Sequence, residues 1–152
     1  MNSKIVPLLA VLLVVAVAGF LYLDQKQLDK EASLLSAEAQ FLQGEMYEKG
    51  WGRPKNTPDA IRWYEYAADN GYAEAQFRLG NLYYEGARVQ QDLHEAMKWY
   101  LLAANNGHVD AEYRVGLMYQ NGEGVPQDRV EAEKWISMAR EQGKDKDQTS
   151  SG

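Results

Sequence analysis

The sequence predicts an all-α protein: a right-handed α-solenoid of three 36-residue helix-turn-helix repeats, preceded by one N-terminal transmembrane (signal-anchor) helix. Three observations lead to this prediction. They are a gap-free internal repeat, two helical patterns in every copy, and a long uncharged segment near the amino terminus. The predicted order is a tail at 1–4, the span at 5–23, a helical linker or cap at 24–36, repeats at 37–72, 73–108 and 109–144, and a disordered tail at 145–152.

Residues 5–23 contain no charged side chain. A helix of this length would be about 28 Å long, close to the ~30 Å hydrocarbon core of a bilayer. Two interpretations remain open: an uncleaved signal anchor, or a signal peptide cleaved after Ala18, where the motif Ala16-Val17-Ala18 fits the small-x-small rule. The apolar run continues beyond Ala18, which favours the anchor.

The short, weakly charged amino-terminal tail favours export of the repeats that follow the span. We therefore expect a single-pass membrane protein whose repeats lie in the periplasm or outside the cytoplasm. The alternative is a soluble secreted protein released by cleavage at Ala18. The linker at 24–36 lacks Gly and Pro and places Leu28, Ala32 and Leu35 on one helical face, so it either caps the first repeat or continues the membrane helix.

The repeat returns the same residues every 36 positions without a gap. The recurring positions are Ala39, Ala75 and Ala111; Gly44, Gly80 and Gly116; Tyr47, Tyr83 and Tyr119; Gly50, Gly86 and Gly122; Ala60, Ala96 and Ala132; Trp63, Trp99 and Trp135; and Gly71, Gly107 and Gly143. A fixed period of this size is typical of a repeat architecture, in which neighbouring copies stack and bury a continuous core.

Each copy is predicted to form two antiparallel helices, which cover 73–85 and 93–106 in the middle copy. The second helix carries an apolar stripe that includes Trp99, so the recurring Trp residues are assigned to the core. Its N-caps are Asn56, Asp92 and Asp128, and its left-handed C-caps are Gly71, Gly107 and Gly143.

A glycine recurs in the middle of the first helix, although it costs about 1 kcal/mol there relative to Ala. Its return at Gly80 in the middle copy suggests that a second helix approaches closely, with Trp99 or Tyr83 filling the space beside it.

Comparison of the copies predicts where the stack ends. Two positions on one face of the second helix are apolar in the first two copies and charged in the third. They are Ile61 and Ala68, then Met97 and Ala104, then Glu133 and Arg140. A terminal repeat needs such a polar outer face, so the array is predicted to end near Gly143.

The recurring residues resemble the Sel-one-like repeat, a tetratricopeptide-like helical repeat, over residues 37–144. The turn between the helices departs from the family pattern at two places, because Arg88 replaces a Gly and Arg53 replaces a Val. The resemblance implies an α-helical scaffold that mediates protein–protein interactions.

Candidate partner-binding residues are those that the resemblance places on the concave side and that differ between copies. On the first helices they form what we call the first-helix stripe: Glu38, Leu42, Glu45 and Lys49; Glu74, Arg78, Asn81 and Glu85; Asp110, Arg114, Leu117 and Asn121. Tyr84 and Gln120 lie nearby, and Trp51 in the first turn is a further candidate. The alternatives are an ordinary solvated helix face and local packing of Trp51.

Composition excludes several functions. The formal net charge is −6, with 16 basic and 22 acidic residues, so binding of nucleic acid is not expected. The chain has no cysteine, and its two histidines, His94 and His108, occupy unrelated positions that are expected at the surface. We expect no cofactor, no metal site and no small-molecule substrate. An enzyme that uses acids of the groove, such as Glu74 and Asp110, is a less favoured alternative.

Overall fold

The computed structural model describes residues 26, 27, 29, 30, 32, 33 and 35–149 and divides the chain into two units, residues 1–35 and residues 36–152. The predicted span at 5–23 lies outside the described residues. Among the residues that are described, none of the helices combines the length and the apolar character needed to cross a bilayer. In the first unit, residues 26, 27, 29, 30 and 32 are helical, while a capping role for 24–36 stays a prediction.

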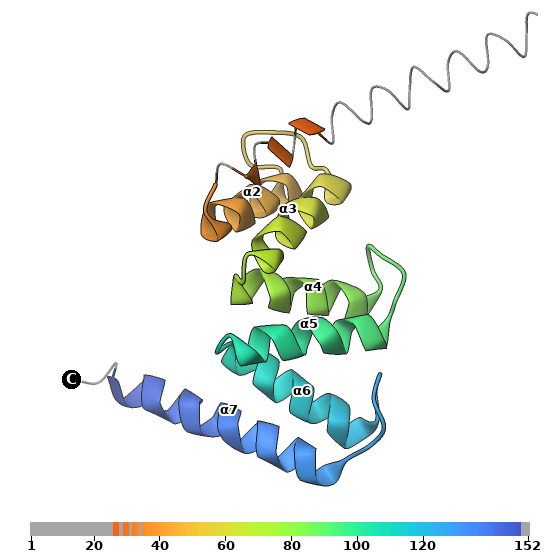
Figure 1. The fold of residues 1–152 in the computed structure, drawn as a ribbon, viewed down its shortest axis with the longest axis vertical. Coiled ribbons are helices and arrows are strands. Elements are labelled where there is room, and N and C mark those ends of the chain that lie inside the picture. The colour runs from red at the N-terminus through yellow and green to blue at the C-terminus, as the bar shows by residue number, and fades with distance from the viewer. Residues whose placement is uncertain (1–25, 28, 31, 34, 150–152) are drawn as a thin grey trace, which may run out of the picture. The chain divides into compact units, whose positions relative to one another are not determined.

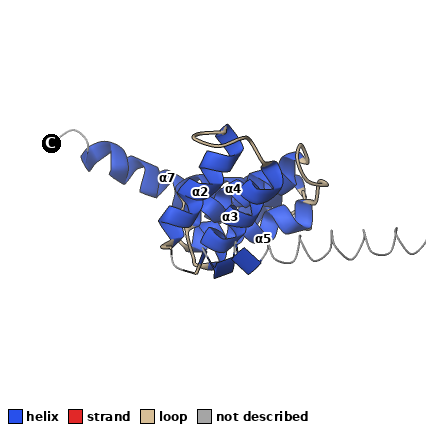
Figure 2. Cartoon of the chain, turned by 90° about the horizontal axis from the view of Figure 1, so that it is seen from above, coloured by secondary structure: helices blue, strands red, loops and turns tan. Residues whose placement is uncertain are grey.

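The second unit consists, over its described residues, of six helices in three antiparallel pairs (Figure 1). They are α2 (Ala37–Lys49), α3 (Thr57–Asp69), α4 (Ala73–Glu85), α5 (Leu93–Asn105), α6 (Val109–Asn121) and α7 (Arg129–Thr149). Each pair corresponds to one predicted repeat, and α3 packs on α4 as α5 packs on α6. The described part of the chain is helix and loop throughout (Figure 2). The three helical repeats are confirmed, and the right-handed sense stays a prediction.

The second helix of every repeat begins at the predicted cap. An oxygen of Asn56, Asp92 or Asp128 accepts a hydrogen bond from the backbone N–H three residues later, at 3.2, 3.0 and 3.1 Å. Such a bond satisfies one of the donors that a helix leaves free at its amino end. In the middle copy the helix ends one residue earlier than predicted, at Asn105.

Two of the three predicted left-handed glycines are confirmed, since Gly71 and Gly107 both have φ of 82°. The prediction for Gly143 is wrong, because α7 continues through it to Thr149. Residues 145–149, expected to be disordered, are part of this helix. Gly71 and Gly107 reverse the chain into the next first helix, whereas the chain continues as helix through Gly143, where a glycine costs only about 1 kcal/mol relative to Ala.

The mid-helix glycines give room to an aromatic ring, but the predicted partner residue is wrong. A Cβ atom at Gly80 would lie 2.5 Å from Tyr100 Cδ1, and one at Gly44 would lie 2.5 Å from Tyr64 Cε1. The ring comes from the residue after the recurring Trp, because that position turns toward the first helix. In the third copy Ile136 takes this place.

Buried side chains form two clusters, one around Tyr64 and Leu79 and one around Tyr100 and Val115. The recurring Trp residues are structural as predicted: Trp63 is buried, and the other two pack against these clusters.

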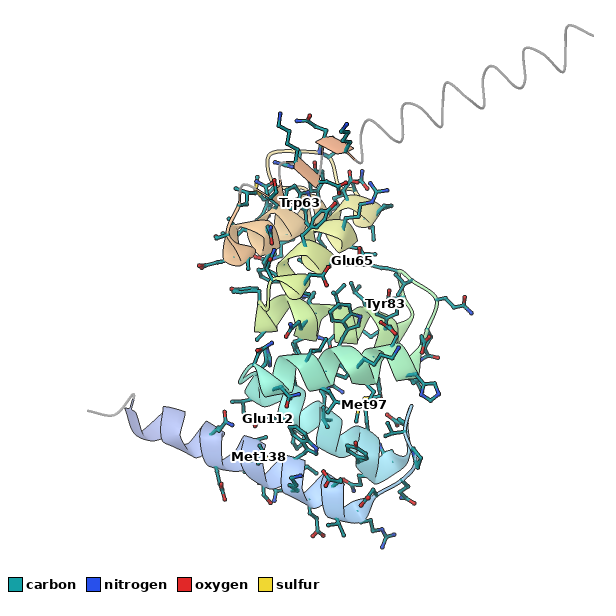
Figure 3. The ribbon with its side chains drawn as sticks, in the orientation of Figure 1. Trp63, Glu65, Tyr83, Met97, Glu112 and Met138 are labelled. Carbon is teal, nitrogen blue, oxygen red and sulfur yellow. The ribbon has the colours of Figure 1, made fainter. Side chains whose placement is uncertain are left out.

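The exposure predicted for the two charged positions of the third copy is confirmed. Met97 on α5 (Figure 3) and Ala104 are buried between repeats, whereas Glu133 and Arg140 on α7 are exposed.

Candidate partner-binding surface

The first-helix stripe lies on α2, α4 and α6, and none of its twelve residues is buried. Leu42, the most exposed apolar member, shows 51% of its surface to solvent. The recurring alanines and glycines face the second helices, so the residues that differ between copies remain at the surface. The stripe is therefore accessible to a partner.

Some of these candidates are occupied by internal contacts. Glu45 pairs with Lys49 at 2.7 Å, and Asn81 accepts a hydrogen bond from the Tyr100 hydroxyl at 2.7 Å. Burial raises the pKa of Tyr100, so its hydroxyl stays protonated and remains a donor. The first contact lies within α2 and the second joins α4 to α5, and both leave these side chains little binding capacity.

Two arginines of the stripe are differently placed. Arg78 on α4 and Arg114 on α6 lie one repeat apart, and within the described residues neither has a carboxylate at ion-pair distance. Arg114 lies over the ring of Tyr84, 5.8 Å from its centroid. Arg78 lines a cavity of about 250 Å³, together with Glu48, Asn81, Leu82, Glu85, Ala87 and Arg88. The stripe thus offers two guanidinium groups to an incoming ligand.

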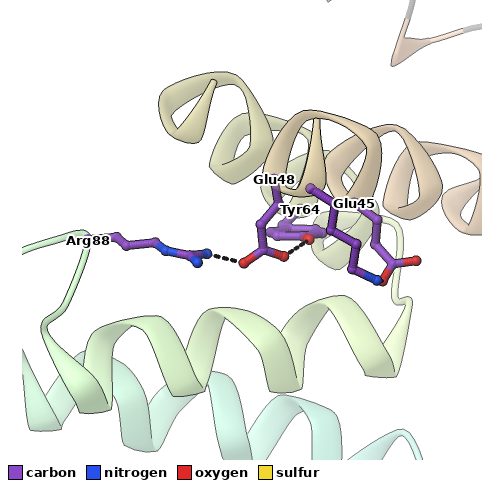
Figure 4. A network of polar contacts seen from close by, with 5 residues as sticks. Glu45, Glu48, Tyr64 and Arg88 are labelled. Carbon is purple, nitrogen blue, oxygen red and sulfur yellow. Dashed lines mark hydrogen bonds and ion pairs between the residues drawn. The ribbon is translucent and has the colours of Figure 1, made fainter. Parts of the chain in front are cut away.

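A polar bridge joins repeats 1 and 2 at the edge of this cavity (Figure 4). Glu48 accepts hydrogen bonds from the Tyr64 hydroxyl at 2.7 Å and from the Arg88 guanidinium. Burial raises the pKa of Glu48, but these two donors outweigh it and leave the pKa below its ordinary value. The irregular Arg88 of the second turn therefore has a structural partner, and sequence analysis missed that partner, Glu48.

A second bridge joins repeats 2 and 3 at the corresponding place. The Tyr84 hydroxyl donates to Glu123 at 2.9 Å, and this bond, followed by burial, raises the pKa of Tyr84. Tyr84 occupies the position of Glu48 one repeat later, so the predicted partner residue Tyr84 already serves in packing. The signal that could have found both bridges is the 36-residue spacing between Glu48 and Tyr84.

His108 is not a surface residue, contrary to expectation. Its ring stacks on Phe77 with centroids 4.3 Å apart, and its Nδ1 accepts a hydrogen bond from the backbone N–H of Ala111 at 3.3 Å. The proton therefore sits on Nε2, which donates to Glu74 at 3.0 Å. His108 is the N-cap of α6. In the sequence it lies in a short turn between two helices, and no pattern indicated that it would form a cap. His94 is exposed as predicted.

The two acids proposed for an enzymatic alternative lie near this cap. Glu74 and Asp110 line a surface depression of about 550 Å³ with His108. Glu74 is half-exposed and engaged by the histidine, and Asp110 is exposed. Among the described residues, no three acidic or histidine side chains lie close enough together to hold a metal ion.

A row of buried polar residues was also missed by sequence analysis. Gln40, Gln76 and Glu112 occupy one position of the first helix and are buried in all three copies (Glu112 is labelled in Figure 3). Each accepts a hydrogen bond from the end of the second helix of its repeat, donated by Asn70, Asn106 and Gln142 at 3.0, 2.8 and 2.7 Å. A polar residue that recurs one position after the fixed alanine was the available signal.

Trp51 does not pack into the fold. Its side chain is 56% exposed, and Lys49 Nζ lies 4.4 Å from the centroid of its ring. Of the predicted candidates, those without a side-chain hydrogen bond or ion pair among the described residues are Glu38, Leu42, Trp51, Arg78, Glu85, Asp110, Arg114, Leu117 and Gln120.

Comparison with known proteins defines the class. The Sel1 repeat matches residues 37–72, 73–108 and 109–144, the same boundaries that the internal period predicts, and the chain belongs to the Sel1 repeat family. The structure is similar to that of a Sel1 repeat protein from Oxalobacter formigenes, with a TM-score of 0.72 and 38% identity over 79% of this chain and 90% of that one.

Two further solved structures share the fold. One is c5321, a protective antigen of uropathogenic Escherichia coli, with a TM-score of 0.70 and 38% identity over 78% of this chain and 25% of that one. The other is Helicobacter pylori cysteine rich protein B, with a TM-score of 0.59 and 24% identity over 76% and 88%, which indicates likeness of fold alone. No curated protein matches this chain.

Proposed function

We propose that this Sel1 repeat protein is a membrane-anchored, non-enzymatic scaffold that binds a protein partner through the first-helix stripe. The proposed location is the extracytoplasmic side of a bacterial inner membrane, with residues 5–23 as the anchor. The observation that supports the partner-binding part is the pair of arginines, Arg78 and Arg114, which lie on the first helices of adjacent repeats and have no ion-pair partner among the described residues.

The chemistry of these arginines indicates the kind of partner. A guanidinium group can hold a carboxylate through two parallel hydrogen bonds, and arginine is enriched among residues that dominate interface energetics. Apolar contact area lies at the same surface, because Leu42 occupies the arginine position in the first copy and Leu117 lies one turn after Arg114. The stripe therefore suits a peptide segment that carries both acidic and apolar side chains.

Charge reversal tests this proposal in the full chain. In pull-downs from a detergent extract of the native membrane, Arg78→Glu combined with Arg114→Glu should reduce partner recovery by about tenfold, since each lost ionic contact typically weakens binding several-fold. The matched control is Arg129→Glu with Arg140→Glu on α7, which makes the same change in net charge at exposed positions. Equal recovery with all three proteins, or equal loss with both variants, would contradict the proposal.

The anchor has a direct test of its own. An uncleaved span predicts a purified protein with the mass of the full chain, which stays with the membrane after carbonate extraction. Cleavage after Ala18 predicts a mature amino terminus at Gly19 and a soluble periplasmic or secreted binding protein. The mass of the mature protein separates the two without reference to any partner.

A further inference from the structure

We propose that the turn of the first repeat is a second binding site, which docks on the surface of an anionic phospholipid bilayer. We call it the basic turn and define it by Lys49, Trp51, Arg53 and Lys55. This site is separate from the first-helix stripe that carries the proposed function, and it differs from it in chemistry.

Comparison of the three turns isolates this feature. The residues at the four positions are Lys49, Trp51, Arg53 and Lys55 in the first copy, Glu85, Ala87, Val89 and Gln91 in the second, and Asn121, Glu123, Val125 and Gln127 in the third. Every difference adds a positive charge or an aromatic ring. This occurs in a segment, residues 24–152, that holds 22 acidic but only 15 basic side chains.

At one of these four positions the first copy lacks an apolar contact that the other two copies make. Val89 and Val125 both pack against the buried clusters. At the same position Arg53 instead lies over the ring of Tyr47, 4.3 Å from the centroid, and lines a surface depression with Lys55. Where the other two copies have an apolar contact with a buried cluster, the first copy therefore has a partly exposed cation.

The backbone presents the basic turn rigidly. The N–H groups of Gly50 and Trp51 both donate to Met46 O, at 2.9 and 3.0 Å, and Asn56 N donates to Tyr47 O at 3.0 Å. Gly50 also adopts the left-handed conformation, with φ of 76°. These bonds fix the backbone of the turn that carries the exposed Trp51 indole.

Of the described acidic residues close to the turn in sequence, Glu45 neutralises Lys49, but none is paired with Arg53 or Lys55. Glu48 is held by Arg88 and Tyr64, and Asp59 lies with Arg62 at 3.5 Å. Glu45 pairs with Lys49 alone.

Within the described residues, Arg53 and Lys55 have no carboxylate at ion-pair distance. Two cations beside an exposed indole remain for an external anionic surface.

The combination of residues favours a bilayer over a protein as the occupant. Indole rings are enriched at the membrane–water interface, and Lys and Arg next to them are attracted to anionic headgroups. The predicted span ends at residue 23, and the 13 residues that follow can reach at most about 45 Å when fully extended. The first repeat is therefore the copy that the anchor would keep nearest to the bilayer.

Tryptophan quenching of the full chain tests the proposal. The protein is reconstituted into vesicles of phosphatidylcholine alone or mixed equally with phosphatidylglycerol, and acrylamide quenching is compared between wild type and Trp51→Phe. Their difference reports Trp51, because Trp63 is buried and Trp99 and Trp135 are partly buried. Quenching of Trp51 should be about twofold weaker in the anionic vesicles and should recover at high salt, since the attraction is electrostatic.

A matched pair of variants makes the result specific. Arg53→Glu with Lys55→Glu should abolish the protection of Trp51, whereas Lys98→Glu with Lys134→Glu, at exposed lysines of α5 and α7, should preserve it. Equal quenching in both vesicle types, or equal loss with both variants, overturns the proposal. So does cross-linking of the turn to a protein in native membranes without lipid protection, which would make an acidic protein the occupant. Partner recovery through Arg78 and Arg114 is measured independently.

Discussion

The interface between repeats 1 and 2 and the interface between repeats 2 and 3 bury the same kinds of apolar side chain but use different polar groups. At the first, Gln76 Nε2 donates to Ala68 O at 2.9 Å. At the second, the same position holds Glu112, whose residue exposure is 2%.

The helix caps at the two interfaces differ in the same way. The amino end of α4 has Tyr72 without a side-chain cap, whereas α6 has the capping His108.

This difference shows which interactions fix the stacking. Alanines and aromatic rings recur in the buried clusters at both interfaces. Polar partners change from copy to copy, as in the bridges of Glu48 and Tyr84, because each hydrogen bond contributes only about 1 kcal/mol to stability. The recurring apolar side chains set the geometry with which the repeats stack, and the polar groups adjust the stability of each interface.

The largest effect is expected when the first interface is given the side chain of the second. Gln76→Glu removes the donor to Ala68 O and places a carboxylate in a buried site, so the free energy of unfolding should fall by about 2 kcal/mol. Urea denaturation of the full chain in detergent, followed by Trp fluorescence, measures it. Gln90→Glu, at an exposed turn position, is the matched control and should change little.

The next effect concerns the cap that only the second interface has. His108→Ala should lower the free energy of unfolding by about 1 to 2 kcal/mol, because it removes an N-cap and the stacking on Phe77. His94→Ala, at the exposed histidine, serves as the control in the same urea titration. A similar shift in both variants would show that the cap contributes nothing.

The reverse exchange should strengthen the second interface. Glu112→Gln keeps the acceptor for Gln142 and supplies the amide donor that Gln76 uses one repeat earlier. We expect stability to rise by about 1 kcal/mol, the usual contribution of one hydrogen bond. A rise in the thermal midpoint would support the equivalence of the two positions, and a fall would refute it.

The smallest effect is expected at the bridge that Glu48 forms with Tyr64 and Arg88, and this effect depends on pH. Because the pKa of Glu48 is lowered in the folded state, its contribution is present above the ordinary carboxyl pKa and is lost as the pH falls through the folded value. The contribution should be under about 1 kcal/mol, since Arg88 is half-exposed. Glu48→Gln should remove this part of the acid dependence of the urea midpoint, and unchanged acid dependence would argue against the bridge.

Sequence periodicity predicted the repeats well because it reports on short-range geometry. The first helix of the middle copy has the predicted bounds, Ala73–Glu85, and the caps at Asn56, Asp92 and Asp128 form as expected. Both features depend on residues within one or two turns of each other. The extension of α7 through Gly143 was missed because glycine is common at helix ends but is also tolerated inside a helix.

The candidate site was predicted less completely. The stripe is exposed as expected, but Asn81 and Tyr84 have internal partners 19 and 39 residues away. Which side chains stay free depends on which ones meet after stacking, and sequence spacing alone does not determine this.

By itself, the sequence determined the three repeats, their helices and N-caps, and the polar outer face at Glu133 and Arg140, because these follow from a fixed period and local hydrogen bonding. Only the tertiary structure decided that Tyr100, not Trp99, fills the space at Gly80, that His108 caps a helix, and that Arg78, Arg114, Arg53 and Lys55 have no ion-pair partner among the described residues. The physical reason is that these outcomes depend on contacts between helices, made by side chains far apart in the sequence that meet only after the helices have packed.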